Sequence, residues 1–105
     1  MRGMSEEYPR LLQLRMDRRF LIGNMSIKFE REIEEKGVKE YDKVLIRVEK
    51  LDSSKQVEIP AYFHWIQTMA GRRPQFIVKE EEYELLLREG FQDMEPIKLT
   101  ILKVL

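Results

Sequence analysis

The 105-residue chain contains no cysteine and only one histidine, and both shortages limit the chemistry that it can perform. Without cysteine there is no disulfide, no thiolate zinc site and no cysteine nucleophile. One imidazole without thiolates does not supply the usual sets of zinc ligands. No glycine-rich phosphate loop is present either, because the five glycines are scattered along the chain. We therefore expect no metal and no cofactor.

The chain also lacks an excess of charge of either sign, because 19 Lys and Arg residues balance 19 Asp and Glu residues. This balance argues against a protein that wraps nucleic acid along its length, since such proteins need a basic excess to release counterions. Uninterrupted apolar runs are short, so the sequence predicts no transmembrane helix. No apolar stretch of secretory length follows Met1, and we expect a cytoplasmic protein.

The length fits one compact domain, and the hydrophobic fraction of 43% is sufficient for a globular core. Glu, Lys and Arg are abundant, whereas Asn and Gln are scarce, which is typical of proteins from thermophiles. Because a chain this short often supplements its core by oligomerising, its size favours a homodimer.

The first part of the chain, residues 10–60, predicts a hairpin, a helix and a second hairpin. Residues 11–22 fit two patterns. Apolar residues at every fourth position over 8–20 fit a helix, whereas alternation over 12–16 fits a strand. We favour the strand, followed by a hairpin whose turn is Gly23-Asn24, a dipeptide suited to two-residue turns.

The evidence for the next helix and hairpin is clearer. Charged residues surround the apolar positions of 29–35, and Gly37 is well placed to end a helix there. Val44, Ile46 and Val48 then alternate with residues 43, 45, 47 and 49, most of which are charged, and this pattern indicates a strand. The polar turn 52–55 joins this strand to the strand 56–59, so the two strands form the second hairpin.

The remaining residues, 61–105, predict a helix, a strand, a helix and a strand that complete the domain. Pro60 suits the first position of a helix over 61–70, because its missing N–H would be unpaired there in any case. Residues 72–74 then form a connection. Beyond it we expect a strand at 75–78, a helix at 81–89 and a strand at 97–105. The chain thus predicts an α+β fold of antiparallel hairpins with about three short helices.

Catalytic candidates are few. The one histidine, His64, lies in the aromatic run 62–65, where a packed or surface imidazole is the simpler interpretation. A hydrolase triad would need Ser53 or Ser54 as nucleophile, and neither lies in a Gly-x-Ser-x-Gly motif. The consecutive glutamates 80–82 complement the dipole at a helix start without converging on a metal. We predict a binding protein and not an enzyme.

Two groups of residues are candidates for binding a partner. Arginine side chains suit phosphates and guanine edges, so the first group, Arg15, Arg18 and Arg19, predicts contact with double-stranded DNA. Tyr, Trp and Arg are enriched at protein interfaces. The second group therefore predicts an alternative function, a protein-interaction module (an adaptor or inhibitor) that docks through segment 62–65. Its members are Tyr62, Trp65, Arg72 and Arg73.

One stretch resembles a known family. Residues 37–49, Gly-Val-Lys-Glu-Tyr-Asp-Lys-Val-Leu-Ile-Arg-Val-Glu, are similar to the second half of the AbrB-type swapped-hairpin DNA-binding domain, and residues 14–19 are similar to its first strand and basic turn. The chain departs from the family at Tyr41, where the family usually has glycine. The resemblance implies an intertwined homodimer that regulates transcription, whose first strands and basic turns contact DNA. The residues facing the DNA would be Arg15, Arg18 and Arg19.

Overall fold

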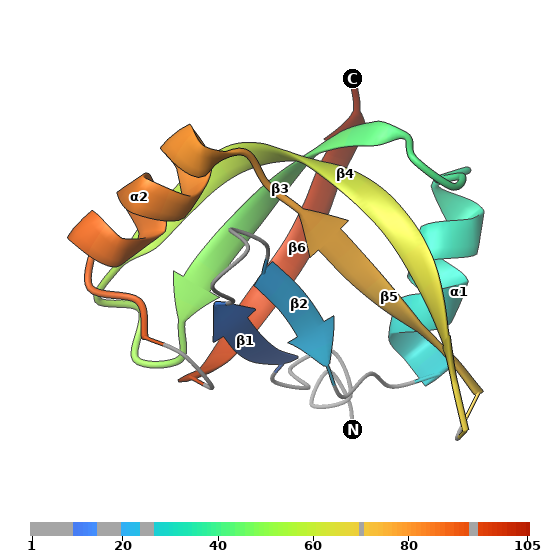
Figure 1. Ribbon diagram of the computed structural model, residues 1–105, viewed down its shortest axis with the longest axis horizontal. Coiled ribbons are helices and arrows are strands. Elements are labelled where there is room, and N and C mark those ends of the chain that lie inside the picture. Colours follow the sequence, from blue (N-terminus) through green and yellow to red (C-terminus); the bar gives the residue numbers. More distant parts are fainter. Residues whose placement is uncertain (1–9, 15–19, 24–26, 70, 93–94) are drawn as a thin grey trace.

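Six strands close into a barrel, and two helices lie on opposite sides of it (Figure 1). The computed structural model describes residues 10–14, 20–23, 27–69, 71–92 and 95–105. The elements are β1 (Arg10–Leu14), β2 (Phe20–Gly23), α1 (Ile27–Glu35), β3 (Lys43–Lys50), β4 (Gln56–Thr68), β5 (Gly71–Ile77), α2 (Glu80–Arg88) and β6 (Glu95–Val104). The order around the barrel is β1-β2-β5-β4-β3-β6, and every neighbouring pair is antiparallel.

The interior of the barrel is filled by alternate residues of β3, β4, β5 and β6. Because successive side chains of a strand point to opposite faces, every second residue reaches the core. Barrels of this size have room only for side chains inside, so the interior is a packed core and not a channel. The buried residues of these strands are Val44, Ile46, Val48, Ile59, Ala61, Phe63, Pro74, Phe76, Ile97, Leu99 and Ile101.

Each helix contributes a fully buried residue that anchors it to the barrel. Ile33 anchors α1, and the helix ends at a glycine with a left-handed backbone, Gly37, whose φ is 70°. Leu86 anchors α2, and Phe91 is buried just beyond that helix. Among the described residues, no helix is long and apolar enough to cross a membrane.

The structure confirms the mixed helix and antiparallel-sheet class and the single compact domain. Its radius of gyration, 12.9 Å, matches the value of about 13 Å expected for a compact domain of this size. The hairpin of β3 and β4, the final strand and the helices near 29–35 and 81–89 are also confirmed. Of the two patterns proposed for the first segment, residues 10–14 form the strand.

The helix predicted over 61–70 is wrong, and the described residues form two helices instead of three. This segment continues β4 as far as Thr68, so that β4 pairs with β3 at one end and with β5 at the other. The run from Ala61 to Ile66 is rich in aromatic residues, which favour strands. Packing between two neighbouring strands outweighed the signal of Pro60 as a helix start.

Pro60 is tolerated because of its place in the sheet. Phe63 exchanges backbone hydrogen bonds with residues 41 and 42 on the β3 side of β4. The alternation of an antiparallel ladder then turns the nitrogen of Pro60 away from β3. Pairing with β5 begins only at Tyr62, so the missing N–H breaks no bond of the ladder.

Two other predictions are corrected. Residues 72–74 are not a connection but part of β5, where Pro74 lies opposite Trp65 at a buried position. The hairpin at Gly23-Asn24 is also wrong, because β2 pairs with β1 and β5, and Ile27 already belongs to α1. The alternating residues of β1 offer β2 a partner strand, whereas the charge-rich sequence after Ile27 favours a helix.

Candidate functional site

Strand alternation places the aromatic run of β4 on two faces. Phe63 points into the core and is fully buried, and Trp65 lies on the same side. Tyr62 and His64 lie on the outer face, each partly exposed. The structure therefore separates the predicted partner-binding residues Tyr62 and Trp65 onto opposite faces of the strand.

Trp65 and Arg72 form one packed group at the end of the core. The Trp65 ring meets Phe63 edge-on, with their centroids 5.0 Å apart. The Arg72 guanidinium lies over the Trp65 ring, 3.9 Å from its centroid, and pairs with Glu34 of α1 at 3.3 Å. This arrangement links the β4–β5 hairpin to α1, so both residues have a structural role.

The remaining predicted site residues are less completely described. Arg73 lies in β5 opposite Ile66, and its side chain lies outside the described part. The predicted DNA-contacting residues Arg15, Arg18 and Arg19 all lie outside the described residues. Their role in binding DNA stays a prediction.

Glu40, in the loop between α1 and β3, ties that loop to β4. One carboxylate oxygen accepts a hydrogen bond from the backbone N–H of Trp65 at 2.8 Å. The other accepts from Nδ1 of His64 at 2.7 Å. Both contacts favour the ionised carboxylate, and the bond from Trp65 contributes most to holding the pKa of Glu40 below its ordinary value.

This shift predicts an acid-dependent loss of stability. Because the pKa of Glu40 is lower in the folded state than in the unfolded state, its stabilisation is present above the ordinary value of 4.5 and is lost as the pH falls through the folded value. Urea unfolding should show the advantage of the native protein over Glu40→Gln shrinking below about pH 4.5. Glu35→Gln, at an exposed position of α1, controls for the loss of one charge. An advantage that grows with acidity would contradict this role for Glu40.

Tyr41 is the unusual residue of the same loop. Its φ is 64°, a left-handed conformation that glycine prefers, and 61% of its surface is exposed. Its backbone N–H donates to the carbonyl oxygen of Phe63 at 2.6 Å. The Tyr41 ring stacks on His64, with centroids 5.1 Å apart and planes within 10°. The loop thus presents a flat aromatic pair on the outside of the barrel.

The geometry does not assemble a hydrolase triad. Ser53 and Ser54 lie in the turn before β4, whereas His64 is eight residues beyond Gln56, the first residue of β4. At about 3.3 Å per residue, that separation is about 26 Å, far beyond hydrogen-bonding distance. In the part of the chain that the structure describes, no three His, Cys, Asp or Glu side chains lie close enough together to hold a metal ion.

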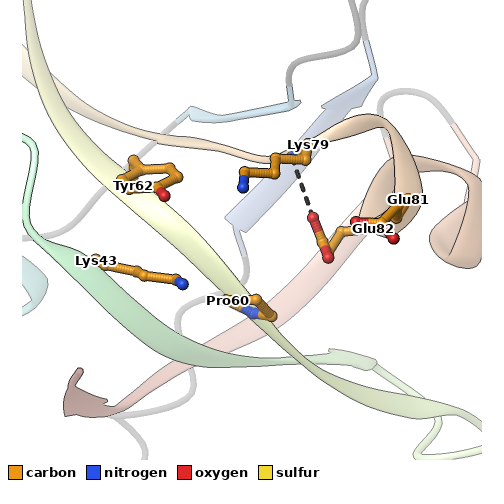
Figure 2. Close-up of a pocket in the computed structure, with 6 residues that line it drawn as sticks. All are labelled: Lys43, Pro60, Tyr62, Lys79, Glu81 and Glu82. Carbon is orange, nitrogen blue, oxygen red and sulfur yellow. Dashed lines mark hydrogen bonds between the residues drawn. The ribbon is translucent and has the colours of Figure 1, made fainter.

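A hollow of about 190 Å³ lies between the outer face of the β3–β4 hairpin and the start of α2. Lys43 and Tyr62 face each other across the hairpin and form one side of the hollow. Lys79 lies across from them at the start of α2 (Figure 2). The Glu82 carboxylate turns back and accepts a hydrogen bond from the backbone N–H of Lys79 at 3.2 Å. Pro60 and Glu81 complete the lining.

No protein-family model matches the chain, and neither a curated protein nor a solved structure matches it closely enough to indicate a relationship. The resemblance to the swapped-hairpin domain stays a prediction. The function of the chain therefore has to be inferred from its own structure.

The sequence indicates Tyr62 as a site residue, but its pattern does not single out Tyr41, Lys43 or Lys79. A turn at 52–55 fixes the pairing of β3 with β4, and counting outward from it places Lys43 opposite Tyr62. Because the predicted second strand ends at 59, the prediction does not extend the pairing as far as Tyr62. The one signal at Tyr41 is that the family which this stretch resembles usually has glycine there, the residue that a left-handed backbone favours.

Proposed function

We propose that the protein is a non-enzymatic interaction module that docks a partner protein through the Tyr41 face. This face consists of Tyr41 together with Tyr62, His64 and Ile66 on the outside of β4. The observation that carries the proposal is the exposed Tyr41 ring, stacked on His64 from a left-handed backbone position.

The backbone conformation is the unusual part of this arrangement. A non-glycine residue in a sparsely populated conformation costs about 1–3 kcal/mol, and such residues cluster at functional sites. Glycine at position 41 would avoid this cost, but it would remove the stacked and exposed ring. Keeping a tyrosine here is consistent with a binding role for the ring.

The composition of the face supports a protein partner. Tyrosine offers a large, rigid contact area with a polar end and is enriched among the residues that dominate binding energy at interfaces. Charges of both signs lie beside it, from Lys39, Glu40 and Asp42, and no basic excess is present to attract a polyanion. A dimeric DNA-binding regulator acting through Arg15, Arg18 and Arg19 is the competing hypothesis, and it uses a different segment.

Site-specific photo-crosslinking in the native cells tests the proposal. A photoreactive phenylalanine analogue at position 41 should capture a specific protein, whereas the same group at Leu87, which is also exposed, should not. The purified partner should then bind the native chain at least about tenfold more tightly than the Tyr41→Ser variant, as expected for an interface hot spot. Leu87→Ser is the matched control and should bind as the native chain does.

The outcomes separate the hypotheses. Alanine at Arg15, Arg18 and Arg19 should leave the crosslink at position 41 intact. A crosslink to a second copy of the chain identifies the partner as the homodimer expected from its size. Equal capture from positions 41 and 87, or equal binding by the two serine variants, would overturn the proposal.

A further inference from the structure

The hollow between the β3–β4 hairpin and α2 has chemistry of its own. We propose that it binds a small ligand through an oxyanion group, either a carboxylate or a phosphate, held between Lys43, Lys79 and the phenol of Tyr62. This inference goes beyond partner docking by the Tyr41 face and does not depend on it.

Three hydrogen-bond donors without partners in the described part of the chain line the hollow. In the view of Figure 2, the ammonium groups of Lys43 and Lys79 and the hydroxyl of Tyr62 lie at the corners of a triangle in the lining of the hollow. Among the described residues, none of these three groups has a hydrogen-bond or ion-pair partner, and none has an interaction left unstated. Bonds from ammonium groups to carboxylate or phosphate oxygens are charge-assisted and roughly twice as strong as neutral ones.

Two glutamates, Glu81 and Glu82, also line the hollow. Glu82 is already engaged by the backbone N–H at the start of α2, which is the favourable end of a helix for a negative charge. In the view of Figure 2, Glu81 lies beyond Glu82, on the side away from Tyr62. The lining is nevertheless balanced at two lysines and two glutamates, so repulsion disfavours a ligand with many negative charges. A ligand that carries one or two negative charges fits this balance, and a nucleic-acid chain does not.

The size of the hollow restricts the ligand to a small molecule. The volume of the hollow is about 190 Å³. Pockets for drug-sized ligands are larger, at about 300–1,000 Å³. The hollow therefore suits inorganic phosphate, a phosphorylated short-chain alcohol or a short dicarboxylate, and not a whole nucleotide.

Titration calorimetry with three probes tests the proposal: inorganic phosphate, glycerol 3-phosphate and succinate. The native chain should bind at least one of them saturably at millimolar concentrations or below. Lys43→Met and Lys79→Met should each weaken that binding about tenfold, since a hydrogen bond to a charged group contributes that much. Lys36→Met is the matched control. It removes the same charge just after α1, on the other side of the barrel, and should leave binding unchanged (Figure 1).

Each outcome bears on the proposal. Binding of the two phosphates but not of succinate assigns the group as a phosphate, and the reverse assigns a carboxylate. No saturable binding of any probe overturns the proposal. So does an equal loss in all three variants, because that result indicates a general charge effect. Circular dichroism checks that the variants fold, which is expected because both lysines are exposed. Loss of the crosslink at Tyr41 would leave these results unaffected.

Discussion

Replacing Phe63 with alanine is expected to lower the free energy of unfolding by about 3–5 kcal/mol, the usual cost of truncating a buried phenylalanine. The Phe63 side chain is fully buried, and its ring packs against Phe76, 5.6 Å away between centroids, and against Trp65. Since small domains have a total stability of only about 5–15 kcal/mol, this variant should be close to unfolding at ordinary temperatures.

The neighbouring residue supplies the matched control. Tyr62 lies on the outer face of β4 and is only partly buried, so Tyr62→Ala should cost much less than Phe63→Ala. Urea unfolding of both variants, with the slope of the transition compared, measures the difference. Similar losses at the two positions would contradict the strand alternation in this segment.

Leu86→Ala is the second substitution with a large expected effect, about 2–5 kcal/mol. Leu86 is the fully buried residue of α2, and Tyr83 and Leu85 of the same helix are only partly buried against the core. Leu87→Ala, one residue along, removes the same atoms from a side chain that is 47% exposed. It should change stability by no more than about 0.5 kcal/mol, as is usual for surface positions.

The loss at Leu86 should also be localised. Hydrogen exchange is expected to speed up first in α2, because its docking depends most on this side chain. Oxyanion binding should weaken in the same variant, since Lys79 would no longer be held opposite Lys43. Uniform acceleration across β3 and β6, with α2 no faster than the sheet, would contradict this view of how α2 is anchored.

Each element that the sequence predicts correctly has clear signals in its own segment of the chain. The alternation over 44–49 and the polar turn at 52–55 determine the hairpin, because the inner face of β3 is wholly apolar over these residues and its outer face carries the charges of Lys43, Arg47 and Glu49. Gly37 and the charged residues before it similarly mark α1, since a left-handed residue ends the helix there. These features depend on neighbours in the chain and can be recognised without knowledge of the tertiary structure.

The second half of β4 could not be recognised in this way. Its outer face carries Tyr62 and Ile66, and its inner face carries Ala61 and Phe63, so apolar residues do not alternate with polar ones. The period of two is therefore hidden. Only pairing with β5, a strand that itself contains two arginines and a proline, reveals this segment as a strand.

The candidate sites were predicted less completely than the fold for a related reason. Tyr62 can be recognised in the sequence because it belongs to an aromatic run. Lys43 and Lys79 are ordinary exposed lysines, and only the fold brings them together across the hollow. Tyr41 meets His64 only because the loop before β3 folds against β4. Such sites depend on contacts between distant residues, and composition alone does not reveal them.

The position of β6 between β1 and β3 has a kinetic consequence. β6 follows all the other strands in the chain, yet it pairs with β1, 83 to 87 residues earlier, and with β3. The barrel therefore cannot close until its last strand is available, and closure must overcome the entropy of a long loop. Folding rates fall as contacting residues become more distant in sequence, so this domain should fold slowly for its size. Until β6 docks, the edges of β1 and β3 remain open to pairing with other chains.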